Sequence, residues 1–204
     1  MDGEGLQPAS NEIESNPRLD QILQEMDKKF EGKEGLKPSQ AWEYKQQVIA
    51  KYQLPENDRI SIDPTSYIHN VEALLKDNNI QVRPKHEFQN FFNENPTARA
   101  VNFEPNVFRD STVVVANASE NNFKQLKKRA KDLSHEAVHA LQDIRYPSMP
   151  YEEKEREAYY YECLTPEMII RYKDNPEELF AVLDDLIDMS VTVDQKTGAT
   201  VDSR

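Results

Sequence analysis

Several features are scarce in this chain of 204 residues, and each scarcity excludes a class of protein. A single cysteine, Cys163, excludes a framework of disulfides within the chain. No apolar run approaches the roughly 18 residues that are needed to cross a bilayer. The N-terminus also lacks the basic start and the apolar segment of a signal peptide. We therefore expect no membrane span and a cytoplasmic location.

Basic residues are few as well, since 25 lysines and arginines stand against 37 aspartates and glutamates. The formal net charge is -12, whereas nucleic acids and anionic membranes select basic surfaces. Neither is therefore expected as the main partner. The two ends are polar and have no sustained apolar period, which predicts a disordered tail over residues 1–15 and a flexible tail over residues 190–204.

Between these tails, the first region is expected to be helical and to pack on the rest of the protein. Within residues 16–78, apolar residues recur every three or four positions in three segments, which indicates amphipathic helices. Proline near the start of each segment suits the first turn of a helix. The expected helices span residues 16–32, 38–54 and 64–78.

After residue 79 the pattern changes to short alternating or β-branched segments, which are followed by more helices. Strands are expected at residues 80–82, 97–103 and 111–116. Three further helices are expected: one from a cap at Ser119 to about Arg145, one over 151–172 that Pro166 interrupts or restarts, and one over 176–189.

The helix that follows Ser119 contains the sequence His-Glu-Ala-Val-His, which has the spacing HExxH. Positions i and i+4 lie about 40° apart around a helix, so His135 and His139 project from one face as two ligands for one metal ion. Glu136 lies about 100° from His135, where it can reach a metal-bound water and accept its proton. The apolar stripe of this helix is expected to face the core, which leaves the histidines on a face directed into a groove. The stripe comprises Phe123, Leu126, Ala130, Leu133, Ala137, Leu141 and Ile144.

A catalytic zinc site uses three protein ligands and a water, so a third ligand must come from another segment. The following helix carries the carboxylates of Glu152, Glu153, Glu155, Glu157 and Glu162. Glu157 shares a side of this helix with Tyr160 and Leu164, which are expected to point inward, and it therefore ranks first. Glu155 lies on a side of more mixed composition and ranks second, and Glu153 ranks third.

This pattern resembles the gluzincin branch of the zincin metallopeptidases, in which HExxH lies on one helix and a glutamate, often followed by alanine, lies on the next. The resemblance covers roughly residues 97–165 and extends to minimal zincins. It implies an α+β fold with N-terminal helices and a small zincin-like core over residues 79–189. That core would contain a short mixed sheet, the HExxH helix and the Glu-bearing helix. The metzincin extension is absent, because Gln142 and Arg145 occupy the positions of its glycine and histidine.

The resemblance also implies a zinc-dependent peptidase that acts on a peptide or protein substrate. His135, His139 and Glu157 would hold Zn²⁺, and Glu136 would be the general base. A group that stabilises the oxyanion is expected among Tyr146, Tyr151, Tyr160, Tyr161, His69 and His86. The alternative is a zinc-binding interaction module, or an inactive zincin in which the metal is structural.

Overall fold

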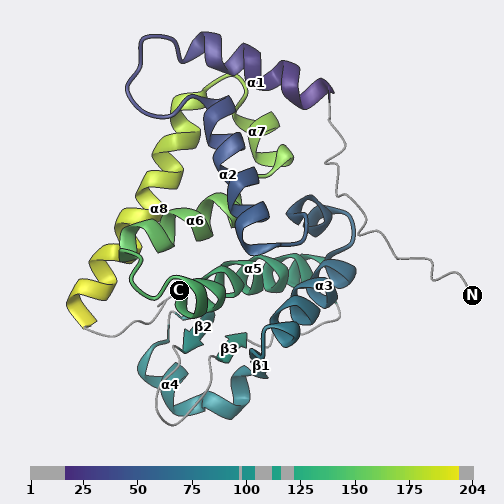
Figure 1. Ribbon diagram of the computed structural model, residues 1–204, viewed down its shortest axis with the longest axis vertical. Helices are drawn as coiled ribbons and strands as arrows, with labels where there is room; N and C mark the ends of the chain where they lie inside the picture. Colours follow the sequence, from purple (N-terminus) through teal and green to yellow (C-terminus); the bar gives the residue numbers. More distant parts are fainter. Residues whose placement is uncertain (1–16, 97, 104–111, 116–121, 198–204) are drawn as a thin grey trace, which may run out of the picture.

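The computed structural model describes residues 17–96, 98–103, 112–115 and 122–197 of the chain, and these residues are mainly helical (Figure 1). The expected combination of helices with a few strands is present. In chain order the elements are α1 (Pro17–Lys29), α2 (Pro38–Tyr52), η1 (Asn57–Ser61), α3 (Pro64–Asp77), β1 (Gln81–Pro84), η2 (Lys85–Phe88), α4 (Gln89–Glu94), β2 (Ala100–Phe103), β3 (Thr112–Val115), α5 (Phe123–Arg145), α6 (Tyr151–Cys163), α7 (Pro166–Tyr172) and α8 (Pro176–Thr197).

Local capping explains where several of these helices begin. Asp63 caps α3 by accepting a hydrogen bond from the Ser66 backbone N–H at 3.0 Å. Thr165 caps α7 in the same way, and Pro166 follows it, so the interruption expected at this proline is confirmed. Asn122 caps α5, whereas Ser119, the expected cap, lies outside the described residues. Helix α8 continues to Thr197, beyond the predicted end at residue 189.

The three strands form one small mixed sheet with the order β1-β3-β2. Strand β3 lies in the centre, parallel to β1 and antiparallel to β2. The short helix α4 was not predicted, because its six residues are too few to reveal a helical period. Its Phe92 packs with Val101 of β2 in a separate small apolar cluster.

Helix α5 crosses the middle of the molecule, with the sheet on one side, α6 on the other and α3 packed along it (Figure 1). Because neighbours cover it on several sides, every residue from Ser134 to Gln142 is buried. The expectation of one core stripe and a separate face toward a groove is corrected here, since burial includes the histidine face. Phe123 and Ile144, at the two ends of the stripe, are instead 52% and 45% exposed, because they lie near the helix ends.

Polar contacts fasten the N-terminal helices to α6. The buried Lys45 ammonium of α2 donates to Asn57 Oδ1 and to the Leu164 carbonyl, both at 2.5 Å. The hydroxyls of Tyr67 on α3 and Tyr161 on α6 lie 2.6 Å apart in a hydrogen bond. Among the described residues, no helix has both the length and the apolar character that a membrane crossing requires.

Candidate metal centre

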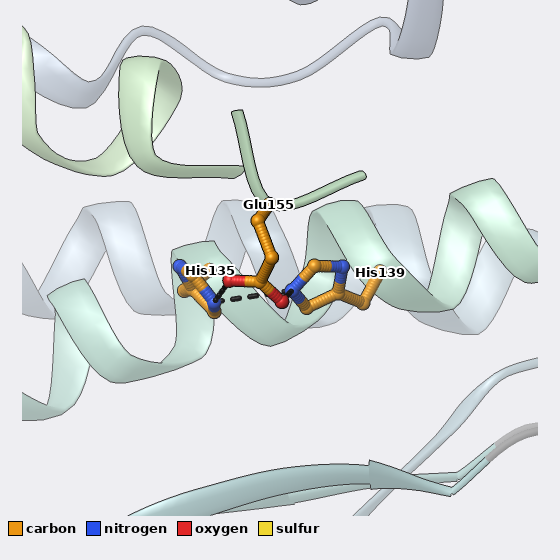
Figure 2. A group of neighbouring side chains, drawn as sticks. All are labelled: His135, His139 and Glu155. Atoms are coloured by element: carbon orange, nitrogen blue, oxygen red, sulfur yellow. Dashed lines mark hydrogen bonds and ion pairs between the residues drawn. The ribbon is translucent and has the colours of Figure 1, made fainter. Parts of the chain in front are cut away.

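Two histidines of α5 and one glutamate of α6 meet between these helices. His135 and His139 project from adjacent turns of α5, and the Glu155 carboxylate lies between their rings (Figure 2). The two Nε2 atoms are 3.1 Å apart. Glu155 places Oε1 at 3.2 Å from His139 Nε2 and Oε2 at 3.7 Å from His135 Nε2. Three donor atoms therefore surround one point.

The separations between these donor atoms suit a single small cation. A tetrahedral ion with nitrogen and oxygen ligands at about 2.0–2.2 Å requires pairs of donors about 3.3–3.6 Å apart. The observed separations of 3.1, 3.2 and 3.7 Å lie close to this range. The buried His-His-Glu group can therefore bind a metal ion.

The surroundings of Glu155 supply a second test of this fit. Its side chain is 0% exposed, and neither carboxylate oxygen accepts a hydrogen bond from any residue that the structure describes. Burial of a carboxylate is costly unless hydrogen bonds or a cation compensate it. The two histidines beside it are 6% exposed each, so little solvent reaches the carboxylate through them. A metal cation at this point would supply the missing compensation.

The orientation of His139 follows from its contact with Gln142, one turn further along α5. The Gln142 amide nitrogen donates to the Lys154 carbonyl at 3.1 Å and to Glu157 Oε2 at 2.9 Å. Both partners are acceptors, so this nitrogen is correctly placed and the amide oxygen must face His139. That oxygen lies 2.8 Å from His139 Nδ1, which must therefore carry a proton and donate. In the neutral ring the lone pair is then on Nε2, toward Glu155.

His135 is positioned by two residues of α6. Glu162 Oε2 lies 3.2 Å from His135 Nδ1, and a carboxylate there favours a proton on that nitrogen. The ring of Tyr159 packs on the imidazole with centroids 4.5 Å apart. His135 thus also directs Nε2 toward the common point.

The third residue of the group differs from the sequence-based ranking, because Glu155 and not Glu157 lies with the histidines. Positions 155 and 157 lie about 200° apart around a helix, so only one of them can share the histidine side of α6. Glu157 is also buried, but its Oε1 accepts from Lys51 Nζ at 2.6 Å and its Oε2 accepts from the Tyr52 hydroxyl at 2.5 Å. Hydrogen bonds from α2 and Gln142 therefore occupy the Glu157 carboxylate. Glu153, the third candidate, is exposed.

The remaining predicted site residues occupy different environments. Glu136 is only 3% exposed on α5, between the two histidines in sequence. Tyr161, a candidate for oxyanion stabilisation, donates its hydroxyl to the Pro55 carbonyl at 2.7 Å, and Tyr160 packs edge-on against Tyr44. His69 and His86 are exposed. These contacts commit Tyr161 to the packing of α6 against the N-terminal region.

Sequence reasoning gave no site role to Lys51, Tyr52, Gln142 and Tyr159, and it named Glu162 only as one of five candidate carboxylates. For three of them a signal exists. Gln142 follows His139 by three positions, and residues with that spacing are neighbours on a helix. Tyr159 and Glu162 follow Glu155 by four and seven positions, which places them on its side of α6. No comparable signal links Lys51 and Tyr52 to a glutamate more than 100 positions later.

Comparisons with known proteins place this site in no established group. No protein-family model matches the chain, and neither a curated protein nor a solved structure does. The class of the site, a buried His-His-Glu group that can bind a metal ion, is thus defined by its own residues.

Proposed function

We propose that this protein is a zinc-dependent metallopeptidase of the zincin type, with Zn²⁺ held by His135, His139 and Glu155. One observation carries the proposal: three buried donor atoms, two of them from an HExxH motif, surround one point at separations near those of tetrahedral zinc ligands. Two imidazoles and one carboxylate are a ligand set found in catalytic zinc sites. The α+β zincin-like core and membership of the gluzincin branch belong to the same proposal.

Zn²⁺ bound there would lower the pKa of a coordinated water to near 7 and polarise the carbonyl of a substrate. The chain's own residues do the rest. Glu136 accepts the proton of the attacking water and transfers it to the leaving amine. Gln142 keeps the ring proton of His139 on Nδ1, and the Glu162 carboxylate 3.2 Å from His135 Nδ1 favours the same tautomer there. The substrate is a peptide or protein segment, because amide hydrolysis is the reaction for which this set of residues is suited.

A second candidate function is a structural metal site in an interaction module or in an inactive zincin. The observation that favours it is burial, since the three ligands are between 0% and 6% exposed and they join α5 to α6. A metal there would fasten the two helices together. The two candidates share ligands and differ in whether Glu136 has a chemical role.

Metal analysis and a cleavage assay with an unstructured polypeptide test both candidates. The purified wild type is expected to hold one zinc per chain, and His135→Ala is expected to lose it. Glu136→Gln is expected to retain zinc and to lose hydrolysis. Zinc in the wild type without cleavage would favour the structural site, and a wild type that binds no zinc would refute both. Cleavage by Glu136→Gln at the wild-type rate would refute the role of Glu136 as the base.

A further inference from the structure

A chain of buried hydrogen bonds connects the candidate metal centre with the N-terminal helix α2. His139 donates to Gln142, Gln142 donates to Glu157, and Glu157 accepts from Lys51 and Tyr52 at the end of α2. We call the four residues Gln142, Glu157, Lys51 and Tyr52, of which Gln142 contacts His139 directly, the Gln142 relay. Its members come from α2, α5 and α6, and α2 is far from the other two helices in sequence.

Every link of the Gln142 relay has a fixed direction. Lysine can only donate, so Glu157 Oε1 must accept. Burial and the neighbouring Glu157 carboxylate raise the pKa of the Tyr52 hydroxyl, so this group keeps its proton and remains a donor. Glu157 thus accepts from both residues of α2, and Gln142 meets the same carboxylate with its amide nitrogen at 2.9 Å. Reversal of one link would leave two acceptors or two donors facing each other in a buried site.

The end of α2 is itself held in place, which makes it suitable as an anchor. Arg145, the last residue of α5, donates to the Lys51 carbonyl at 3.3 Å. The ring of Tyr146 packs edge-on against Tyr52 at 5.8 Å between centroids, and the Lys51 ammonium lies 4.3 Å from the centroid of the same ring. Helix α5 therefore contacts the end of α2 directly as well as through Glu157.

We propose that Gln142, Glu157, Lys51 and Tyr52 are positioning residues that hold His139 as the Nδ1–H tautomer, with the Nε2 lone pair directed toward the candidate metal position beside Glu155. This inference rests on the proposed metal-binding function and extends it to α2, which the sequence assigned to a region outside the core. Partners of this kind orient a metal-binding histidine, and their removal typically lowers metal affinity about 10- to 100-fold.

Two matched substitutions test the relay, Tyr52→Phe and Tyr67→Phe. Each removes one hydroxyl from a buried tyrosine of an N-terminal helix, but Tyr67 bonds to Tyr161 and stands outside the relay. Tyr52→Phe is expected to weaken zinc binding about three- to tenfold, below the range for the direct partner of a ligand. Gln142→Met, which removes that direct partner, is expected to weaken it about 10- to 100-fold. Tyr67→Phe is expected to leave zinc affinity unchanged.

Three measurements are made on each protein: zinc affinity by chelator competition, unfolding by urea without metal, and the tautomer of His139 by nitrogen NMR of the zinc-free protein. The inference predicts the Nδ1–H tautomer in the wild type and in Tyr67→Phe, and a mixture of tautomers in Gln142→Met. Equal zinc affinity of the two tyrosine variants, or a wild type with the Nε2–H tautomer, would overturn the relay while the proposed function stands. A wild type that binds no zinc would instead overturn the proposed function.

Discussion

Substitution of Glu155 by glutamine should change stability in opposite directions with and without zinc. The side chain keeps its size, but the carboxylate is replaced by an amide that carries two N–H donors. In the zinc-free protein the carboxylate is wholly buried and accepts no hydrogen bond from the described residues. An amide N–H can donate to His139 Nε2, whose lone pair faces position 155. The glutamine variant is therefore expected to be the more stable protein when metal is absent.

The expected magnitudes follow from the cost of the buried carboxylate and from the stabilisation that zinc binding supplies. A buried polar group without a partner costs about 1–3 kcal/mol, and more when it is charged, so Glu155→Gln is expected to raise the free energy of unfolding by roughly that amount. With free zinc at about 1,000 times its dissociation constant, the wild type gains about 4.1 kcal/mol. A variant that binds about 100-fold more weakly gains only about 1.4 kcal/mol. Zinc should thus change the difference in free energy of unfolding between the two proteins by about 2.7 kcal/mol in favour of the wild type.

The assay is urea unfolding at pH 8, once with a chelator and once with excess zinc. In a chain of this length about 1 kcal/mol corresponds to about 2–4 °C, so thermal unfolding offers an independent reading. Glu157→Gln is the matched control. It should be destabilised in both conditions, because its amide NH2 would face a donor in either orientation: Lys51 at one end, or Tyr52 and Gln142 at the other. A wild type that is more stable than Glu155→Gln in chelator, or an equal gain of both proteins from zinc, would refute the reasoning.

Three further predictions concern stability and are measured by urea unfolding of the zinc-free protein. Burial lowers the pKa of Lys45 to about 8, below its ordinary 10.5, so between these pH values the unfolded chain binds one proton more than the folded protein. The free energy of unfolding of the wild type, relative to Lys45→Met, should therefore rise across pH 8–10. The rise is at most about 1.4 kcal/mol per pH unit. Burial raises the pKa of Asp132 to about 6, above its ordinary 3.8, so between these pH values the folded protein binds one proton more than the unfolded chain. The free energy of unfolding of Asp132→Asn, relative to the wild type, should therefore rise by roughly 2–3 kcal/mol from pH 4 to pH 7. An unchanged difference over this range would refute the destabilising effect of the Asp132 charge. Leu141→Ala should cost about 2–5 kcal/mol, because Leu141 is wholly buried, whereas Ile144→Ala on the half-exposed end of α5 should cost clearly less.

The fold was predictable where local signals are strong. Helices α1, α2 and α3 begin at proline and carry apolar residues at helical spacing, and the sequence ranges agree with the structure within a few residues. The short strands were anticipated in number, but β1 ends two residues after the expected strand 80–82, and β2 begins at Ala100 and not at residue 97. The burial of residues 134–142 of α5 on every face was not predictable, because the histidine face, which reads as polar in the sequence, is covered by packing against other elements. Periodicity reports the apolar faces of a helix, but it does not report what covers the polar ones.

The candidate site was also predictable only where local geometry determines it. The histidine pair follows from its i, i+4 spacing alone, since a helix fixes that geometry. The choice between Glu155 and Glu157 does not follow, because α6 buries both carboxylates and its apolar residues therefore mark no single inward face. The decisive difference is tertiary: α2 supplies donors to Glu157 and none of the described residues donates to Glu155.

The polar groups inside this protein also explain how its helices keep one relative placement. Apolar contacts tolerate small shifts, but a buried hydrogen bond is lost when its partners move by about an ångström. Besides the Gln142 relay, a second set of contacts joins β2, α5 and α6, because Asp143 accepts from Asn102 at 2.5 Å and from Lys154 at 2.6 Å. The two sets reach α5 on consecutive residues, one turn beyond His139. They fix α6 on α5 at the level where Glu155 meets the histidines, so the same contacts that specify the packing also set the distances between the three donor atoms.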